Sequence, residues 1–366
     1  MIGIITINDN NNYGNRLQNL ATYFLLSKYD KTVNIIRRYG CEFKRFPDRK
    51  HYYLAKIYHF VKDAVFYFFH LKRYLIRRKR KKNFLRFNKY IQNGPKIVYK
   101  TKLTSLNEMF DLFVVGSDQV WNPNINGNGM YINMLGFCND GNKKISLAAS
   151  ISQDSLTEAQ TIEFKDYLNS FKCISCREKQ GSILLKSVLN REIETLVDPT
   201  LVLKKEEWDC YCKKPSFVKK ETKFIFVYLL GKKTNKYEEI INYYQTTLGL
   251  EVYEIMNESS VVHSSGPSEF LWLIKNSSFV ITDSYHGTVF SCIFEKPFKI
   301  LKRIGGEDMN SRLTNLKNVL EIDDCSFIDE SNYKQKQFNS VWNKEKLEEE
   351  RARFYSYLNK YIPKAV

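Results

Sequence analysis

The chain has 366 residues, of which 43% are hydrophobic and 27% charged, and its formal net charge is +17. This length fits two domains or one large one with a sizeable core, and the absence of a run of about 18 apolar residues argues against a transmembrane helix. The start, MIGIITIND, predicts a first strand rather than a secretory signal peptide. Eight cysteines without a regular framework then favour reduced thiols in a cytoplasmic protein over a disulfide scaffold.

Strand-like and helix-like segments alternate from the N-terminus. Residues 2–7 predict a buried strand, and residues 14–29 predict the helix that follows it. Further strands are predicted at 31–37, 111–115, 143–148 and 171–176, with helices at 156–169 and 177–189. Apolar runs that alternate with helical patterns favour a parallel sheet with crossover helices.

The alternation starts again after Asp198-Pro199. The second series has strands at 223–230, 250–255, 278–282 and 298–301, and helices at 234–247, 267–275 and 287–295. We therefore predict an α/β fold of two Rossmann-like domains with parallel sheets, residues 1–200 and 201–340. Residues 341–366 are expected to form a C-terminal helix that packs back on either domain.

A basic segment, residues 51–90, interrupts the first domain. It holds 12 Lys or Arg against one acidic residue, Asp63, which gives a net charge of +11. Apolar residues from Leu54 to Leu75 recur at the spacing of one helix face. We expect this face to pack on the first domain or to contact an anionic membrane, with an ordinary peripheral helix pair as the structural alternative. No motif of a nucleic-acid-binding fold accompanies it, so nucleic acid is not an expected partner.

Polar residues follow several predicted strands, and in open α/β sheets ligands bind beyond the carboxyl ends of the strands. The first such segment includes Gly14, Asn15 and Arg16. Glycine permits a tight turn, free N–H groups of the helix favour an anion, and arginine adds a formal charge. The alternative is that Asn15 merely caps the helix.

The second segment follows the strand that ends at Gly116. Ser117, Asp118, Gln119 and Trp121 offer hydroxyl, carboxylate, amide and indole groups, which suit a hydroxyl-rich ligand. The alternative is a capping turn in which the tryptophan plugs a domain interface.

The third segment places Arg177 and Glu178 after the strand at 171–176. A guanidinium there can bind a carboxylate or phosphate with two parallel hydrogen bonds, whereas a surface salt bridge is the structural alternative. The nearby Cys173 and Cys176 are better explained as strand residues than as zinc ligands, because no second C-x-x-C pair or histidine completes a site. No metal site is therefore predicted.

The fourth segment is Asp283-Ser284-Tyr285-His286-Gly287, between a buried strand and a helix. A lone histidine is often structural, but this one lies at a strand end of the kind that binds ligands. Because histidine titrates near neutral pH, His286 can both donate and accept a proton during a reaction.

Six motifs in order along residues 1 to about 320 give the sequence a resemblance to the polysaccharide pyruvyl transferase family. They are NNYGNRLQN, GSDQVWNP, KKISLAASI, SCREK with LVDPTLVL, GPSEFLWLIKNSSFVITDSYHGTVFSCIFEKPF, and SRLTNLKNVL. The resemblance implies a GT-B-like arrangement of two domains with an interdomain cleft. It also implies phosphoenolpyruvate as a co-substrate, no other cofactor, and a sugar diol or lipid-linked oligosaccharide that becomes a pyruvate ketal at the inner face of a membrane.

The resemblance matches His286 to the family's histidine and Arg177 to its Arg-Glu element, and the positions at strand ends suggest roles for the other residues. The expected catalytic residues are His286 and Asp118. The expected donor-binding residues are Gly14, Asn15, Arg16, Arg177, Ser284 and Gly287. The expected acceptor-binding residues are Ser117, Gln119, Trp121 and Asp283.

One position departs from the family pattern. Family members carry an arginine two residues before the histidine, where this chain has Ser284. Another cation, such as Arg16, Lys302 or Arg303, would then bind the donor, or the donor differs. Two other functions remain open: a GT-B-like glycosyltransferase that uses a nucleotide-sugar, and a non-enzymatic basic adaptor for membrane or nucleic acid.

Overall fold

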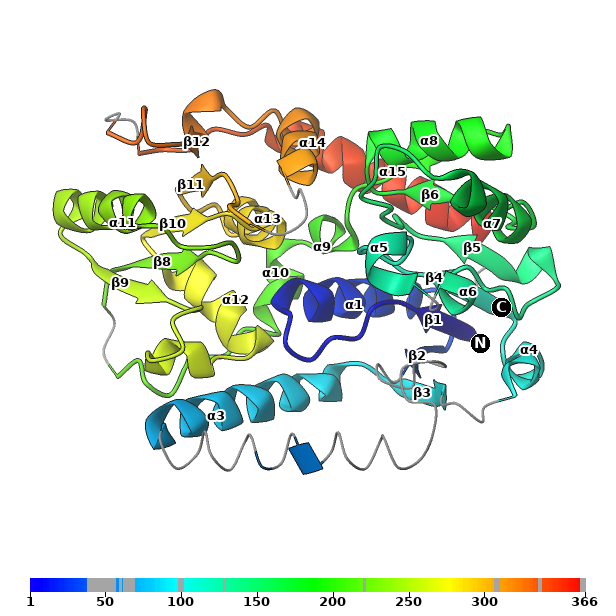
Figure 1. Ribbon diagram of the computed structural model, residues 1–366, viewed down its shortest axis with the longest axis horizontal. Coiled ribbons are helices and arrows are strands. Elements are labelled where there is room, and N and C mark those ends of the chain that lie inside the picture. Colours follow the sequence, from blue (N-terminus) through cyan, green and yellow to red (C-terminus); the bar gives the residue numbers. More distant parts are fainter. Residues whose placement is uncertain are drawn as a thin grey trace. The chain divides into compact units, whose positions relative to one another are not determined.

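The computed structural model describes residues 1–37, 57–58, 61, 70–97, 102–127, 130–219, 222–305, 310–334 and 338–362 (Figure 1). The chain forms two compact units. The first unit comprises Met1–Leu71, Asn88–Val202 and Glu350–Val366, and the second comprises Lys72–Phe87 and Leu203–Glu349.

The first unit is built on a parallel sheet of five strands in the order β3-β2-β1-β4-β5. The strands are β1 (Ile2–Ile5), β2 (Thr32–Arg37), β3 (Asn93–Ile97), β4 (Leu112–Val115) and β5 (Lys144–Ser146). A small parallel pair, β6 (Ser175–Cys176) and β7 (Glu194–Thr195), extends it through isolated bridges. The helices are α1 (Tyr13–Leu26), α4 (Leu106–Met109), α5 (Pro123–Asn126), α6 (Met130–Asn133), α7 (Glu158–Leu168), α8 (Lys179–Leu189) and α9 (Pro199–Val202). The central strands β1 and β4 are apolar and buried throughout, as strands covered on both faces must be.

The second unit repeats this plan with five parallel strands in the order β12-β11-β10-β8-β9. These strands are β8 (Phe224–Tyr228), β9 (Glu251–Glu254), β10 (Phe279–Thr282), β11 (Phe298–Leu301) and β12 (Phe327–Ile328). Its helices are α10 (Lys205–Asp209), α11 (Asn235–Leu248), α12 (Pro267–Asn276), α13 (Tyr285–Ile293), α14 (Asn310–Leu320) and most of α3 (Leu71–Phe87). The predicted α/β class with two parallel sheets is confirmed.

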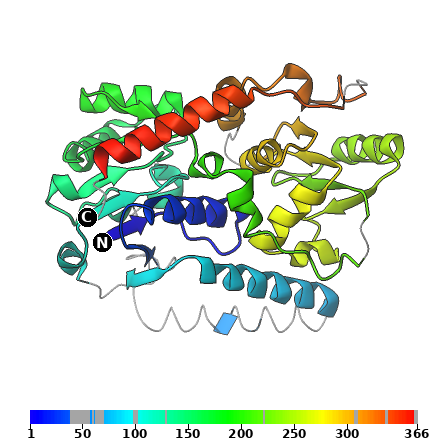
Figure 2. The ribbon, with the colours of Figure 1, turned by 180° about the vertical axis from the view of Figure 1, so that it is seen from behind.

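The last helix, α15 (Lys344–Tyr361), belongs to the first unit from Glu350 onward (Figure 2). Arg351 Nε donates to the carbonyl of Leu201 at 2.9 Å, and the Tyr357 hydroxyl donates to the carbonyl of Ser146 at 2.9 Å. The C-terminal helix therefore packs on the N-terminal sheet, which sequence periodicity alone left undecided.

Helix α3 differs from its predicted form. Leu71 and Leu75 belong to the apolar face that was expected to pack on the first domain or to contact a membrane, and their side chains are 49% and 52% exposed. The buried face instead consists of Ile76, Arg80, Asn83, Phe84 and Phe87. Residues 72–87 also group with the second unit, whereas the sequence assigned the whole insertion to the first domain.

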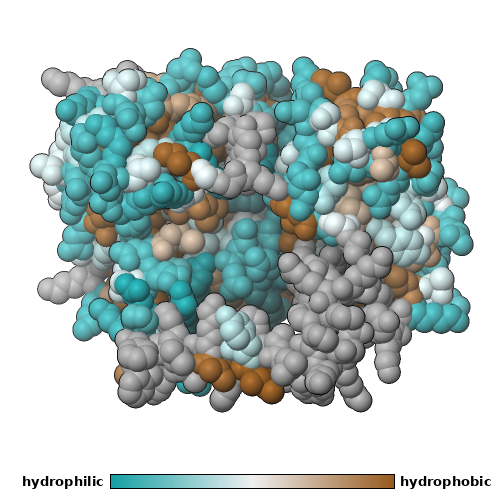
Figure 3. All heavy atoms as spheres, viewed as in Figure 1, coloured by the Kyte–Doolittle hydropathy of each residue, from teal (hydrophilic) through white to brown (hydrophobic). Residues whose placement is uncertain are grey.

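The structure describes only some of the other residues on the predicted apolar face. Ile57 and Val61 are 59% and 52% exposed, and Leu54, Ala64 and Phe68 lie outside the described residues. On the face drawn in Figure 3, hydrophilic residues predominate and hydrophobic ones are scattered. Within the described part of the chain, no helix is long and apolar enough to cross a membrane.

Candidate functional site

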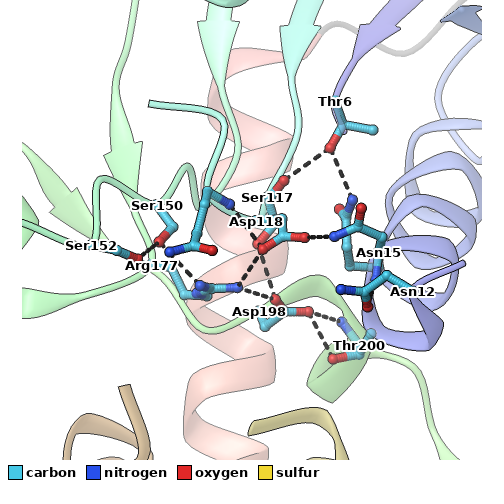
Figure 4. A network of polar contacts seen from close by, with 12 residues as sticks. Thr6, Asn12, Asn15, Ser117, Asp118, Ser150, Ser152, Arg177, Asp198 and Thr200 are labelled. Atoms are coloured by element: carbon cyan, nitrogen blue, oxygen red, sulfur yellow. Dashed lines mark hydrogen bonds and ion pairs between the residues drawn. The ribbon is translucent and has the colours of Figure 1, made fainter. Parts of the chain in front are cut away.

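A buried polar network surrounds Arg177, directly after β6 (Figure 4). Its Nη1 donates to Asp198 Oδ2 at 3.0 Å, and its Nε and Nη2 donate to Glu178 Oε1 at 3.2 and 3.1 Å. Nη2 also donates to Ser150 Oγ at 3.0 Å, and Nη1 lies 4.0 Å from Asp118 Oδ1. Since the Arg177 side chain is only 1% exposed, its guanidinium is enclosed by these groups.

Three carboxylates thus share one guanidinium. Asp118, Glu178 and Asp198 are all buried, so among the ion pairs of the described residues three negative charges face one positive charge. An anionic donor would meet these negative charges, and most of the arginine N–H groups are already engaged. The expected role of Arg177 in donor binding does not fit this geometry, and neither does an exposed salt bridge. The arginine instead orders the carboxylates.

Asp118 occupies a strained position in this network. Its backbone φ is 76°, in the left-handed region that non-glycine residues seldom adopt. Gln119 N donates to its Oδ1 at 2.9 Å, and Asn15 Nδ2 donates to its Oδ2. Its carbonyl accepts from Ser150 N at 2.9 Å. The surroundings therefore fix a carboxylate at the end of β4, as expected of a residue with a chemical role.

The start of α1 supplies one partner of Asp118. Asn12, not Asn15, is the N-cap, because its side chain accepts from Asn15 N at 3.2 Å. The Asn15 side chain is consequently available to Asp118, and the alternative in which Asn15 merely caps the helix is wrong. Gly14 lies in the first turn of this helix and is buried.

Arg16 lies one residue further on, among neutral amides. Its Nη1 donates to the side-chain oxygens of Asn8 and Asn19 at 3.3 and 3.2 Å, and its Nη2 donates to Asn88 Oδ1 at 2.7 Å. Burial lowers the pKa of Arg16 to about 10, with Asp9 opposing the shift. The side chain therefore stays charged at neutral pH, in contact with amide oxygens rather than a carboxylate.

The other residues predicted around Asp118 separate into two groups. Ser117 Oγ donates to Asp198 Oδ2 at 3.0 Å, so Ser117 belongs to the network. Gln119 is buried, and its Nε2 has no hydrogen-bond partner among the described residues. Trp121 is fully buried in the core of the first unit, where its Nε1 donates to the carbonyl of Asn133 at 3.1 Å. The expected role of Trp121 in acceptor binding does not fit its burial, because its polar atom is already bonded.

Sequence reasoning missed several members of the network. Asp198 Oδ1 accepts hydrogen bonds from Thr200 N and Oγ1 at 3.0 and 2.7 Å. Its Oδ2 accepts hydrogen bonds from Ser117 Oγ and Arg177 Nη1. Ser150 donates to Glu178 Oε1. The Asp-Pro-Thr sequence at 198–200 lies at the predicted domain boundary and within the motif LVDPTLVL, but neither feature indicates that its carboxylate contacts Arg177.

The second group of predicted residues lies in the second unit, at the end of β10. Asp283 accepts from Leu230 N through Oδ1 and from Gly231 N through Oδ2, both at 2.7 Å. Burial raises the pKa of Asp283, opposed by these backbone N–H groups and by Arg303. Asp283 thus holds the loop after β8 in place, which does not fit its expected role in acceptor binding.

The first turn of α13 is built by Ser284 and Gly287. Ser284 is the N-cap, and its Oγ accepts from Gly287 N at 3.4 Å. A Cβ at Gly287 would lie 2.3 Å from Thr282 Oγ1, so only glycine allows the helix to approach β10 this closely. Both residues therefore shape the turn, and their polar groups are taken by it rather than being offered to a donor.

His286 lies in this first turn, with its ring at 5.2 Å from the Tyr285 ring in an edge-to-face arrangement. Arg303 is close by, since its Nη2 donates to the carbonyl of Asp283 at 3.3 Å and lies 3.9 Å from Asp283 Oδ1. Its buried Nε has no partner among the described residues. The second unit therefore places a histidine and a guanidinium after the ends of two paired parallel strands, β10 and β11.

The described cysteines and carboxylates do not assemble into a metal centre. Within the described ranges, no three His, Cys, Asp or Glu side chains are grouped so as to hold an ion. Burial raises the pKa of Cys173 to about 11 and raises that of Cys176 as well, so both stay protonated at neutral pH. Neutral buried thiols fit the expectation that these are strand residues.

Comparison with solved structures gives remote similarities. UDP-GlcNAc 2-epimerase from Neisseria meningitidis, bound to UDP-GlcNAc, matches at 10% identity over 98% of this chain and 92% of that one, with a TM-score of 0.48. UDP-N-acetylglucosamine 2-epimerase from Rickettsia bellii matches at 10% identity over 99% and 96%, with a TM-score of 0.45. Similarities this weak carry no conclusion about activity.

Sequence comparisons are more specific. No curated protein sequence matches the chain significantly. The family model of polysaccharide pyruvyl transferase, however, matches residues 12–301, which include both the Arg177 network and the His286 turn. The chain therefore belongs to the polysaccharide pyruvyl transferase family.

Proposed function

We propose that the protein transfers the enolpyruvyl group of phosphoenolpyruvate to two hydroxyls of a sugar in a surface or capsular polysaccharide repeat unit, forming a pyruvate ketal. Family membership is the observation that carries this proposal. The residues at the ends of the parallel strands supply the acid, base and cation that this chemistry needs.

The reaction balances without a redox partner. A proton adds to the vinyl carbon of phosphoenolpyruvate and creates a positive centre at the adjacent carbon. One sugar hydroxyl attacks that centre and loses its proton, and the bond to the phosphate oxygen breaks. The second hydroxyl attacks the same carbon and also loses its proton, which leaves a ketal and inorganic phosphate.

His286 is the proposed proton donor to the vinyl carbon. It lies in the first turn of α13, at the end of a buried strand, and its residue surface is 8% exposed. Histidine titrates close to neutral pH, so it can donate the proton and then accept one from an attacking hydroxyl.

Arg303 is the proposed cation for the carboxylate or phosphate of the donor. The family arginine would stand at Ser284, next to Asp283 in the chain, and Arg303 brings a guanidinium to the carbonyl of Asp283 from another strand end. Its side chain is 11% exposed and its Nε lacks a partner among the described residues, so it retains hydrogen-bonding capacity. The N-terminal turn of α13 also favours an anion.

Asp118 is the proposed base for a sugar hydroxyl. Its carboxylate is fixed by Asn15 and by a strained backbone, within a network in which three carboxylates face one guanidinium. Such surroundings disfavour anions but suit hydroxyl groups, which donate to carboxylates. Gln119 Nε2 and Glu178 Oε2 have no hydrogen-bond partner within the described part of the chain, and they provide a donor and an acceptor for further hydroxyls.

We further propose that the exposed face of α3 contacts an anionic membrane that carries the acceptor. The helix has nine basic and no acidic residues. Several of these are exposed, including Lys72, Arg78, Lys81 and Lys82. Each basic residue near an anionic surface contributes about 1 kcal/mol of attraction.

The deciding experiment incubates the protein with phosphoenolpyruvate and a panel of lipid-linked glycans. The expected product is an acceptor that has gained one pyruvate ketal by mass spectrometry, with one phosphate released per ketal. The same panel is tested with nucleotide-sugars. Nucleotide release with transfer of a sugar would replace the proposed reaction by glycosyl transfer.

A further inference from the structure

The second unit contains a basic pocket that is separate from the His286 turn. Helix α3, residues 213–217 and the segment before and within the first turn of α12 line it, and its empty space of about 390 Å³ includes open solvent. Figures 1 and 2 both show α3 running beside the chain that leads into α12. None of the residues of the His286 turn lines this pocket.

Positive charge dominates the lining. Lys79, Arg86, Lys213 and Lys214 contribute four cations against one acid, Glu269, a formal net charge of +3. The acid is already engaged, because its Oε2 accepts from Gly266 N at 3.0 Å. Its other oxygen lies 3.7 Å from Lys213 Nζ, too far for a strong hydrogen bond. Among the described residues that line the pocket, an anion would therefore meet more cations than acids.

Buried polar residues line the inner part of the pocket, and contacts between two segments hold them in place. Asn83, Ser264 and Ser265 are 8%, 2% and 1% exposed. Asn83 Nδ2 donates to the carbonyl of Ser264 at 2.9 Å, which ties α3 to the loop. A Cβ on Gly266 would come within 2.8 Å of Asn83, so the glycine permits the close contact between these two segments.

The cations at the opening are oriented by neighbours. Lys79 Nζ donates to Ser216 Oγ at 2.8 Å, and Arg86 Nη1 donates to Asn83 Oδ1 at 3.4 Å. Both partners are neutral, so the two side chains are positioned without losing their charge. Several cations with hydroxyl and amide groups around a small space form the arrangement that phosphate groups bind.

We propose that this pocket binds the phosphate or diphosphate group of a phosphorylated ligand. A soluble phosphate ester and a lipid with a phosphate headgroup present the same chemistry to these residues. The inference does not depend on the proposed pyruvyl transfer, because it concerns different residues and is tested by binding alone.

The experiment is isothermal titration calorimetry of the full chain with inorganic diphosphate and geranyl diphosphate, followed by sedimentation with phosphatidylglycerol or phosphatidylcholine vesicles. The test variant is Lys79→Ala with Arg86→Ala. The matched control is Lys165→Ala with Lys186→Ala, which removes the same charge from exposed positions of α7 and α8, outside both the pocket and α3. A second test variant, Lys214→Glu, changes the pocket from another segment. Circular dichroism checks that each variant is folded.

The wild type is expected to bind both diphosphates. The Lys79 and Arg86 variant and Lys214→Glu should each bind at least about tenfold more weakly, whereas the control should stay within about threefold, because charges outside the pocket act only through a screened field. Vesicle binding that falls further in the pocket variants than in the control identifies a lipid headgroup as the source. Vesicle binding that is equal in all variants identifies a soluble ester. Equal loss of diphosphate binding in test and control variants, or no binding by the wild type at low salt, overturns the proposal.

Discussion

Arg177 Nη1 and Asp198 Oδ2 are 3.0 Å apart, and their side chains are 1% and 0% exposed. The two residues are separated by 21 positions in the chain, so this pair joins the end of β6 to the start of α9. Because both partners are buried, loss of Arg177 would leave Asp198 without this cation, whereas Arg177 would still face Glu178 and Asp118 if Asp198 were lost.

Arg177→Ala is expected to destabilise the first unit by about 3–5 kcal/mol, because three buried carboxylates would lose their shared cation. Arg177→Lys should recover only part of this, since lysine cannot donate to Asp198 and Glu178 with a planar fork. Urea denaturation measures the free energy of unfolding, and Arg78→Ala on the exposed face of α3 is the control. An unchanged unfolding free energy together with a raised Michaelis constant for the donor would restore a role in donor binding.

His286→Ala is expected to lower turnover by about 10²–10⁴, because the proposed reaction needs a proton donor at the vinyl carbon. The assay is phosphate release from phosphoenolpyruvate in the presence of acceptor. The exposed His70→Ala serves as the control, and thermal unfolding should show that both variants are folded. Near-normal turnover in the His286 variant would exclude it as the acid.

Arg303→Ala is expected to raise the Michaelis constant for phosphoenolpyruvate about tenfold or more and leave that of the acceptor almost unchanged. The reason is the loss of a charged donor to the carboxylate or phosphate of the co-substrate. Initial-rate measurements with each substrate varied in turn separate the two constants. Lys302→Ala, the exposed neighbour, should have little effect, and an equal effect of both variants would contradict the assignment.

Stability below neutral pH is expected to depend on His263. Burial lowers the pKa of His263, whose Nδ1 donates to the carbonyl of Ile255 at 2.8 Å. As the pH falls below about 6.5, the unfolded chain binds a proton that the folded protein does not, so the folded state loses stability, by up to about 1.4 kcal/mol per pH unit. The loss continues until the pH passes the lowered pKa of the folded state. In His263→Gln, this contribution to the change of unfolding free energy with pH should vanish. Urea denaturation between pH 7 and 5 measures that change. The exposed His70→Gln is the control and should behave like the wild type.

Association with anionic vesicles is expected to depend on the exposed face of α3. Reversal of Arg78, Lys81 and Lys82 to glutamate should abolish sedimentation with phosphatidylglycerol vesicles at low salt, because the attraction becomes repulsion. Arg80 is left unchanged, since its side chain is buried against Phe84, with the guanidinium 4.8 Å from the ring centre. The matched control reverses three exposed lysines on α7 and α8, at 165, 179 and 186. Equal losses in both variants would show that only net charge matters, and no binding by the wild type would exclude a membrane role.

Much of the fold followed from local sequence patterns. β10 was expected at 278–282 and lies at Phe279–Thr282, and α12 was expected at 267–275 and lies at Pro267–Asn276. Such elements are predictable because an apolar run, or an apolar period of 3.6 residues, reflects burial on a sheet or a helix face. β3 was missed, because its sequence NGPKI is short and half exposed, and proline is tolerated there only at the edge of the sheet.

The candidate site was predictable in position but not in pairing. The sequence placed Asp118, Arg177 and His286 at strand ends, because each follows an apolar run. It could not show that Asp118 and Asp198 surround Arg177, since those contacts depend on how crossover connections align distant strands. The same limit applies to α3, whose many basic residues leave no clear apolar period. The sequence by itself determined which polar groups reach the strand ends, and only the tertiary structure decided which of their charges are already neutralised.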